Sequence, residues 1–136
     1  MLIEFARNVC NIKNADSEET GSGQDNFVVS KLSCSLVGEQ EELKIIDKDS
    51  ILYRIIKQIN LVGRYYCNYG FNEKYRKEFE SRGCIITAVS KEGNVRGFEI
   101  KGHPFFIGTL FQPALTSTGE KPDPVIVEFV NRCVKN

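Results

Sequence analysis

The sequence contains no tryptophan, one methionine and one histidine, His103. A protein zinc site needs a cluster of histidine, cysteine or carboxylate ligands, and neither a Cys-x-x-Cys pair nor a second histidine is present. Net charge is lacking too, because 18 basic residues balance 18 acidic ones. A balanced surface without a basic or aromatic stripe argues against nucleic-acid and membrane-surface binding. We therefore expect no metal, no cofactor, no nucleic acid and no membrane as partners.

Long apolar runs are also missing. No stretch approaches the roughly 20 apolar residues of a membrane-spanning helix. The first dozen residues include Glu4, Arg7 and Asn8, which is unlike a secretory signal. The cysteines are odd in number and widely spaced: Cys10, Cys34, Cys67, Cys84 and Cys133. This usage predicts free thiols in a reducing, cytoplasmic environment.

What is present is typical of a globular domain. The 136 residues are 41% hydrophobic and 26% charged, which predicts one domain over residues 1–136 with a real core. Helical spacing of apolar residues predicts helices over 2–11 and 51–58. A third is predicted over 73–82, with Asn72 as its N-cap and Gly83 as its stop. The last helix is expected to bury the stripe Ile126, Phe129, Val130 and Cys133.

The strand signals lie between these helices. A polar loop is predicted over 13–26, followed by strand patterns over 27–36 and 60–71. Residues 84–90 and 95–101 flank a turn and predict a hairpin. The nearly all-apolar segment 105–111 is typical of a central strand buried on both faces. Mixed strands and helices of this kind predict a layered α/β domain.

Five segments carry a resemblance to a known family. They are 3–9 (IEFARNV), 16–19 (DSEE), 63–72 (GRYYCNYGFN), 103–106 (HPFF) and 111–118 (FQPALTST). Together, and in this order, they resemble the C-terminal part of the class I glutamine amidotransferase domain of CTP synthases. The resemblance extends from about Leu2 to Val134. It implies a three-layer α/β, flavodoxin-like fold that lacks its N-terminal strands.

The resemblance also implies a chemistry. In the family a cysteine thiolate attacks the amide of glutamine, a histidine moves the proton and a glutamate orients the histidine. The nucleophile position falls about six residues before Met1 by this matching. The histidine position is Gln112 and the glutamate position is Ala114, so no catalytic residue is intact. Of the substrate contacts, Glu19 matches the residue that holds the substrate ammonium, whereas Asn68 replaces an arginine that pairs with the substrate carboxylate.

Structural interpretations compete with these functional ones. Glu19 stands beside Glu18 and is expected to be a solvated acidic residue. His103 precedes a proline and predicts a turn rather than a catalytic base. Cys67, Cys84 and Cys133 are expected to be inert, the last two as buried core residues. Gln112 and Ala114 either result from sequence drift at a site that has lost its function or belong to a pocket that binds a ligand other than glutamine.

Three functional hypotheses follow. The first is a non-catalytic amidotransferase-like protein with a binding or regulatory role and a small amino-acid-like ligand. The second, of another class, is the C-terminal piece of a longer enzyme, whose cysteine or selenocysteine nucleophile precedes Met1 and whose chemistry is thiol-based, redox or of the amidotransferase type. The third is a domain associated with CTP synthase in nucleotide biosynthesis. Because strands that would flank the central strand are missing, we also expect a homo-oligomer, or a partner chain that covers the exposed sheet.

Overall fold

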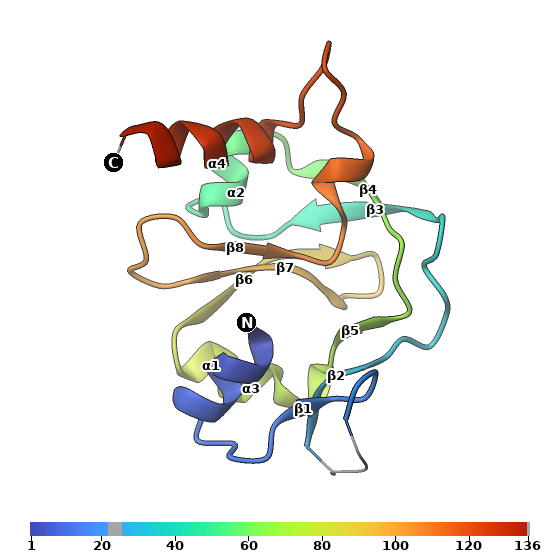
Figure 1. Cartoon of the computed structure of the whole chain (residues 1–136), viewed down its shortest axis with the longest axis vertical. Helices are drawn as coiled ribbons and strands as arrows, with labels where there is room; N and C mark the ends of the chain where they lie inside the picture. The colour runs from blue at the N-terminus through green and yellow to red at the C-terminus, as the bar shows by residue number, and fades with distance from the viewer. Residues whose placement is uncertain (22–25, 136) are drawn as a thin grey trace.

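A five-stranded antiparallel sheet lies between two layers of helices in the computed structural model (Figure 1), which describes residues 1–21 and 26–135. Helices α2 (Ile51–Ile56) and α4 (Pro124–Lys135) cover one face. Helices α1 (Leu2–Asn8) and α3 (Arg76–Ser81) lie on the other. This arrangement confirms the predicted three-layer α/β fold.

The large sheet has the strand order β4-β3-β6-β7-β8. Its strands are β3 (Gln40–Ile45), β4 (Asn60–Arg64), β6 (Cys84–Ser90), β7 (Val95–Ile100) and β8 (Ile107–Thr109). The predicted hairpin is confirmed, because β6 and β7 pair directly around Lys91 to Asn94. A second, small sheet of order β1-β2-β5 lies below it in Figure 1 and comprises β1 (Asp16–Ser17), β2 (Phe27–Lys31) and β5 (Tyr69–Phe71). The predicted loop 13–26 therefore contains β1, and its residues 22–25 lie outside the described residues.

Two apolar clusters fill the space between the layers. On the side of α1 and α3, the Phe79 ring packs against Phe5 and Phe71, with ring centroids 5.1 and 5.0 Å away. On the side of α2, the cluster contains Leu43, Ile45, Leu52, Tyr65, Ala88 and Phe111. Strand β6 contributes to both clusters, through Ile86 to the first and Ala88 to the second. It is therefore β6 that is buried on both faces.

Local sequence explains where the helices begin and end. The Ser50 side chain accepts the N–H of Tyr53 and caps α2. Asn72 caps the short 3-10 turn η1 (Glu73–Tyr75) that leads into α3, because its side chain accepts the N–H of Lys74. Gly83 follows α3 with a φ of +95°, a conformation that glycine adopts without strain. The predicted cap and stop of this helix are thus confirmed.

The prediction for residues 105–111 was wrong. Their strand, β8, lies at the edge of the sheet, and Ile107, Gly108 and Thr109 are half-buried rather than fully buried. The ring of Phe98 on β7 lies directly over Gly108, and a Cβ built there would come within 2.2 Å of it.

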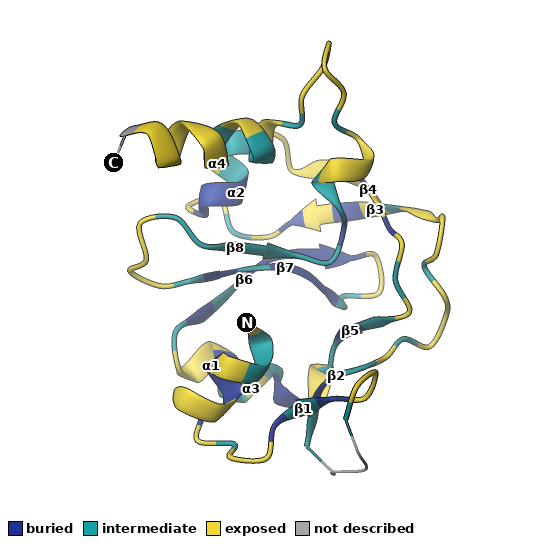
Figure 2. Cartoon of the chain, in the orientation of Figure 1, coloured by how far each residue is buried: buried dark blue, intermediate teal, exposed yellow. Residues whose placement is uncertain are grey.

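The apolar stripe expected on the last helix is also mostly exposed. Phe129 is 55% exposed and Val130 51% exposed, and Cys133 is on the surface as well. Figures 1 and 2 show why, since only the first turns of α4 lie against α2 and the rest of the helix extends past it. Cys133 is therefore not the core residue that the sequence predicted, whereas Cys84 is buried as expected.

Candidate functional site

An apolar cavity of about 300 Å³ opens between the start of α1, the small sheet and the last two strands of the large sheet. Met1, Leu2 and Ile3 line it from α1, and Tyr69 and Phe71 from β5. The sheet contributes Val95, Arg96, Phe98, Gly108, Thr109 and Leu110.

None of the predicted positions Glu19, Asn68, Gln112 and Ala114 lines the cavity, although two of them are close to lining residues in the sequence. Asn68 precedes the lining residue Tyr69, and Gln112 follows Leu110 by two residues. Gln112 is half-buried at the start of the 3-10 turn η2 (Pro113–Leu115), where its N–H donates to the C=O of Arg64 at 2.8 Å. Ala114 lies within η2 and is exposed. An uncharged amide and a methyl group therefore occupy this end of β8.

Glu19 is exposed next to β1, and its N–H donates to the Ser17 hydroxyl at 3.3 Å. The neighbouring Glu18 carboxylate is engaged differently, because it accepts the N–H of Lys31 at 2.6 Å. Burial raises the pKa of the Cys67 thiol, the Arg96 guanidinium opposes that shift, and the Glu19 carboxylate adds to it. The charge of Glu19 thus affects the pKa of Cys67, which is next to Asn68 in the chain. The Glu19 side chain does not make the contact with Lys31 that Glu18 makes.

The buried and half-buried cysteines Cys10, Cys67 and Cys84 are poor nucleophiles at neutral pH. Burial raises the pKa of Cys84 to about 12 and also raises the pKa of Cys10. A thiol acts as a nucleophile only when ionised, so these shifts oppose reactivity. The raised pKa of Cys67 agrees with the expectation that it is inert.

His103 has a structural contact. Its Nδ1 accepts the N–H of Phe105 at 3.2 Å, and its ring meets the Phe106 ring edge-on at 5.5 Å. Such a contact between residues two apart closes a turn. The expectation of a turn-forming histidine agrees with this geometry.

A buried ion pair beside the cavity was not foreseen from the sequence. Arg96 on β7 contacts Glu41 on β3 through two bonds, Nε to Oε2 at 2.7 Å and Nη2 to Oε1 at 3.3 Å. The guanidinium lies 6.0 Å from the centre of the Tyr65 ring. Burial opposes the charge of Arg96, but the Glu41 carboxylate outweighs that effect and raises the Arg96 pKa. The one cationic side chain found among the cavity's lining residues is therefore already paired.

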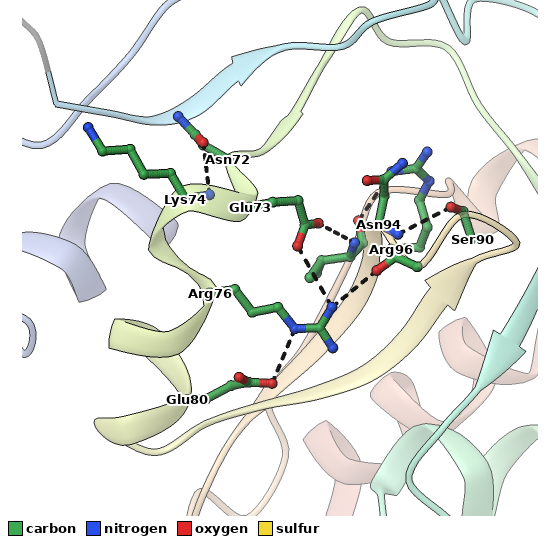
Figure 3. A network of polar contacts seen from close by, with 10 residues as sticks. Asn72, Glu73, Lys74, Arg76, Glu80, Ser90, Asn94 and Arg96 are labelled. Carbon is green, nitrogen blue, oxygen red and sulfur yellow. Dashed lines mark hydrogen bonds and ion pairs between the residues drawn. The ribbon is translucent and has the colours of Figure 1, made fainter.

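The hydroxyl of Tyr65 is buried beside this pair and has no hydrogen-bond partner in the described part of the chain. Burial, and next the Glu41 carboxylate, raise the pKa of Tyr65, so the phenol stays protonated. Figure 3 shows a second polar network near Arg96, which joins α3 to the turn between β6 and β7. There Arg76 bonds the Gly93 carbonyl at 3.1 Å and the Glu80 carboxylate at 3.3 Å. Both networks fix the framework around the cavity.

A carboxylate on the opposite face of β7 orients α2. Glu99 is 4% exposed and accepts the N–H groups of Ile51 at 2.9 Å and Leu52 at 2.8 Å. Burial raises the pKa of Glu99, whereas these two hydrogen bonds oppose the shift. Two charged residues in the otherwise apolar strand 95–100 were the sequence signal for Arg96 and Glu99, but their partners were not predictable from it.

Two kinds of feature are missing from the described ranges. No group of three or more His, Cys, Asp or Glu residues there is placed to hold a metal ion. None of the helices described is long and apolar enough to cross a membrane.

Comparison with known proteins shows what the chain is similar to. The chain is 36% identical over 138 residues to a CTP synthase of Cytophaga hutchinsonii, covering 95% of this chain and 26% of that protein. It is 31% identical over 145 residues to a CTP synthase of Bdellovibrio bacteriovorus, covering 98% and 27%. The chain thus spans about a quarter of the length of these curated relatives. No family model matches it.

The solved glutaminase domain of Trypanosoma brucei CTPS with bound acivicin superposes on this structure with a TM-score of 0.90 at 27% identity. The match covers 99% of this chain and 56% of that one. Sequence and structure agree on the same relationship, and they confirm the resemblance inferred from the five motifs. This chain carries the class I amidotransferase fold of the CTP synthase glutaminase domain, over part of that domain.

Proposed function

We propose that this chain is a non-catalytic glutamine amidotransferase-like module that acts by binding. The observation that carries the proposal is the pair of residues after β8, Gln112 and Ala114. An amide side chain does not accept a proton near neutral pH, and a methyl group orients nothing. Loss of the nucleophile or base alone costs on the order of 10⁶-fold in turnover in a hydrolytic triad.

The ligand class that we propose is a free amino acid or a close analogue. Support comes from Glu19, an exposed carboxylate whose charge adds to the raised pKa of the Cys67 thiol. A carboxylate recognises an ammonium group through charge-assisted hydrogen bonds. Asn68 is uncharged, so the carboxylate end of such a ligand would receive hydrogen bonds but no ion pair.

The binding role is tested by titrating the chain with L-glutamine and, in parallel, with N-acetyl-L-glutamine. We expect glutamine at about 1 mM to shift the backbone NMR signals of Glu19 and Asn68, and the acetylated compound, which lacks the ammonium, to leave them unchanged. Glu19→Gln should weaken binding about tenfold, the effect of losing one charge-assisted hydrogen bond. Glu18→Gln is the matched control and should bind as the wild type does. Equal shifts with both compounds, or no shift with either, would contradict the proposed ligand class.

A second candidate is a longer enzyme that contains this chain. The observation in its favour is that the chain matches 56% of the solved glutaminase-domain chain. Its nucleophile would be a cysteine or selenocysteine encoded upstream of Met1, and its chemistry would be thiol-based, redox or of the amidotransferase type. Sequencing the reading frame upstream of the Met1 codon tests this candidate. A frame that encodes no strand-turn motif with a nucleophile would contradict it.

We also propose that the protein works in the reducing cytoplasm. All five cysteines are free thiols, and two of them, Cys34 and Cys133, are exposed. Exposed thiols persist where glutathione and thioredoxin keep them reduced. Fractionation of cells that express a tagged full chain would test this, and recovery in an oxidising compartment would contradict it.

A further inference from the structure

A groove of about 470 Å³ lies between α2 and α4, the two helices that lie side by side on one face of the large sheet (Figure 1). Residues of α2 and its C-terminal end form one wall, and residues within 122–132 form the other. The apolar cavity beside α1 shares no lining residue with this groove. The groove is therefore a separate candidate site, built by two helices that are far apart in the sequence.

Positive charge gathers in this groove. Three cations line it, Arg54, Lys57 and Arg132. The one carboxylate among the lining residues, Glu128, is held by Arg132, with Oε1 2.6 Å from Nε. No ion pair in the described part of the chain involves Arg54 or Lys57. Arg54 lowers the pKa of Glu99, but that carboxylate already accepts two backbone N–H groups. Two cations thus stay available to an anion.

Lys57 has a backbone conformation that lysine rarely adopts. Its φ is +56°, in the left-handed region, where it ends α2 and its N–H donates to the C=O of Tyr53 at 2.7 Å. Glycine takes this helix-ending position without steric cost, whereas a residue with a Cβ is strained there. Strained residues of this kind cluster at ligand-binding and active sites. A lysine here lowers stability, and a binding role for its charge accounts for its presence.

The remaining walls of the groove are apolar. They consist of Ile51 and Ile55 on α2, and of Pro122, Pro124 and Val127 on the other side. Proline has a fixed φ, so the wall with two prolines is stiff. The volume lies within the range of small-molecule sites, roughly 300–1,000 Å³. A ligand that complements this groove therefore has an anionic group at one end and an apolar body at the other.

We propose that the groove between α2 and α4 binds a small organic phosphate monoester, with the phosphate at Arg54 and Lys57 and the organic group against Ile55 and Val127. Arg54 and Lys57 are three residues apart on α2, so they lie on the same side of it. A phosphate monoester carries about −1.5 to −2 charges at pH 7, which matches two available cations better than a single carboxylate does. The arginine fork bonds two phosphate oxygens, and the lysine supplies a point charge.

An NMR titration of the full chain with phenyl phosphate, inorganic phosphate and phenol tests the proposal. We expect phenyl phosphate to shift the amide signals of Arg54, Lys57 and Arg132 with a dissociation constant of about 1 mM or below. Inorganic phosphate, which has no apolar body, should bind at least about fivefold more weakly, and phenol should shift nothing. The signals of Glu19 and Asn68 should stay in place, because the two sites are separate. Phenyl phosphate that binds no better than phenol, or no better than inorganic phosphate, would overturn the proposal.

Two variants separate the effect of the charge from that of the fold. Lys57→Gly removes one cation and relieves the left-handed backbone, so it should raise the midpoint of thermal unfolding and yet weaken phenyl phosphate binding about tenfold. A loss of binding in a more stable variant does not come from unfolding. Lys48→Gln is the matched control, because Lys48 is exposed just before α2 and does not line the groove, and it should bind as the wild type does. Unchanged binding in Lys57→Gly, or equal losses in both variants, would overturn the proposal in favour of unspecific surface electrostatics.

Discussion

Arg96 on β7 and Glu41 on β3 meet across the intervening strand β6, in a two-bond ion pair that is 6% exposed on the arginine side and 19% on the glutamate side. The pair stands beside the cavity, and its two charges compensate each other. Removing one partner leaves the other charge buried and unpaired, which strongly lowers the free energy of unfolding.

We therefore predict that Glu41→Ala lowers the free energy of unfolding by about 3 kcal/mol. The exposed neighbour Glu42 is the control, and Glu42→Ala should change the same quantity by less than about 0.5 kcal/mol. Urea denaturation followed by circular dichroism measures both. The double variant Glu41→Leu with Arg96→Met should recover much of the loss. Equal effects of Glu41→Ala and Glu42→Ala would show that the pair carries no stability.

Glu99 gives a prediction about pH. Its folded-state pKa lies above the ordinary 4.5, so between those two values the folded chain binds more protons at this site than the unfolded chain does. The contribution of Glu99 to stability should therefore rise as the pH falls through that window. The measurement is the difference in unfolding free energy between wild type and Glu99→Gln from pH 7 down to 4.5. If the unfolding free energy of the wild type fell relative to that of Glu99→Gln as the pH is lowered, the predicted direction would be wrong.

A substitution at the same position tests its capping role. Glu99→Ala leaves the N–H groups of Ile51 and Leu52 without their acceptor. We expect a loss of about 2–3 kcal/mol in unfolding free energy, the cost of unsatisfied buried donors. Glu92→Ala in the exposed turn is the control for loss of a carboxylate. If the two variants unfold at the same urea concentration, the N-terminus of α2 does not depend on Glu99.

The elements with strong local signals were predictable from the sequence. The hairpin of β6 and β7 has a turn between two apolar runs, and α2 and α3 have polar caps at Ser50 and Asn72. Strand β3 was not predicted, because Glu41, Glu42 and Lys44 make it look like a solvated segment. Its charge at Glu41 is satisfied by a residue 55 positions away, and local patterns hold no information about such a partner.

Two apolar segments were predicted to be more buried than they are. Residues 105–111 were interpreted as a central strand, because an apolar run is the same whether it is buried in a sheet or lines a cavity at an edge. The stripe of α4 has helical spacing, but spacing does not reveal how far a helix extends beyond its neighbours. The candidate site itself was found through the family motifs, whereas the Arg96–Glu41–Tyr65 cluster needed coordinates.

The thiols should react in two classes. Cys34 and Cys133 are exposed, whereas Cys10 and Cys84 are buried and their pKa values are raised by that burial. We expect Ellman's reagent at pH 8 to label the two exposed thiols quickly, and the buried pair only after denaturation. The count of fast-reacting thiols should fall by one in each of Cys34→Ser and Cys133→Ser and stay unchanged in Cys84→Ser. Labelling of Cys84 at the rate of Cys34 would contradict the buried assignment.

The contact between β7 and β8 gives a packing prediction. A methyl group at Gly108 would meet the Phe98 ring at 2.2 Å, too close for any side chain. Gly108→Ala should therefore destabilise the chain by about 1–3 kcal/mol through displacement of that ring. Gly119→Ala, where nothing lies within 4 Å of the added atom, is the matched control and should be nearly neutral. Thermal unfolding of the two variants measures the difference, and equal midpoints would place Phe98 elsewhere.

We propose that this amidotransferase-like scaffold does not hydrolyse glutamine. The most direct test is ammonia release from L-glutamine by the purified chain, with the Trypanosoma brucei glutaminase domain as the reference enzyme. The account predicts no release above the protein-free background, because Gln112 and Ala114 supply neither a base nor its orienting carboxylate. Ammonia released in proportion to the concentration of this chain would contradict it.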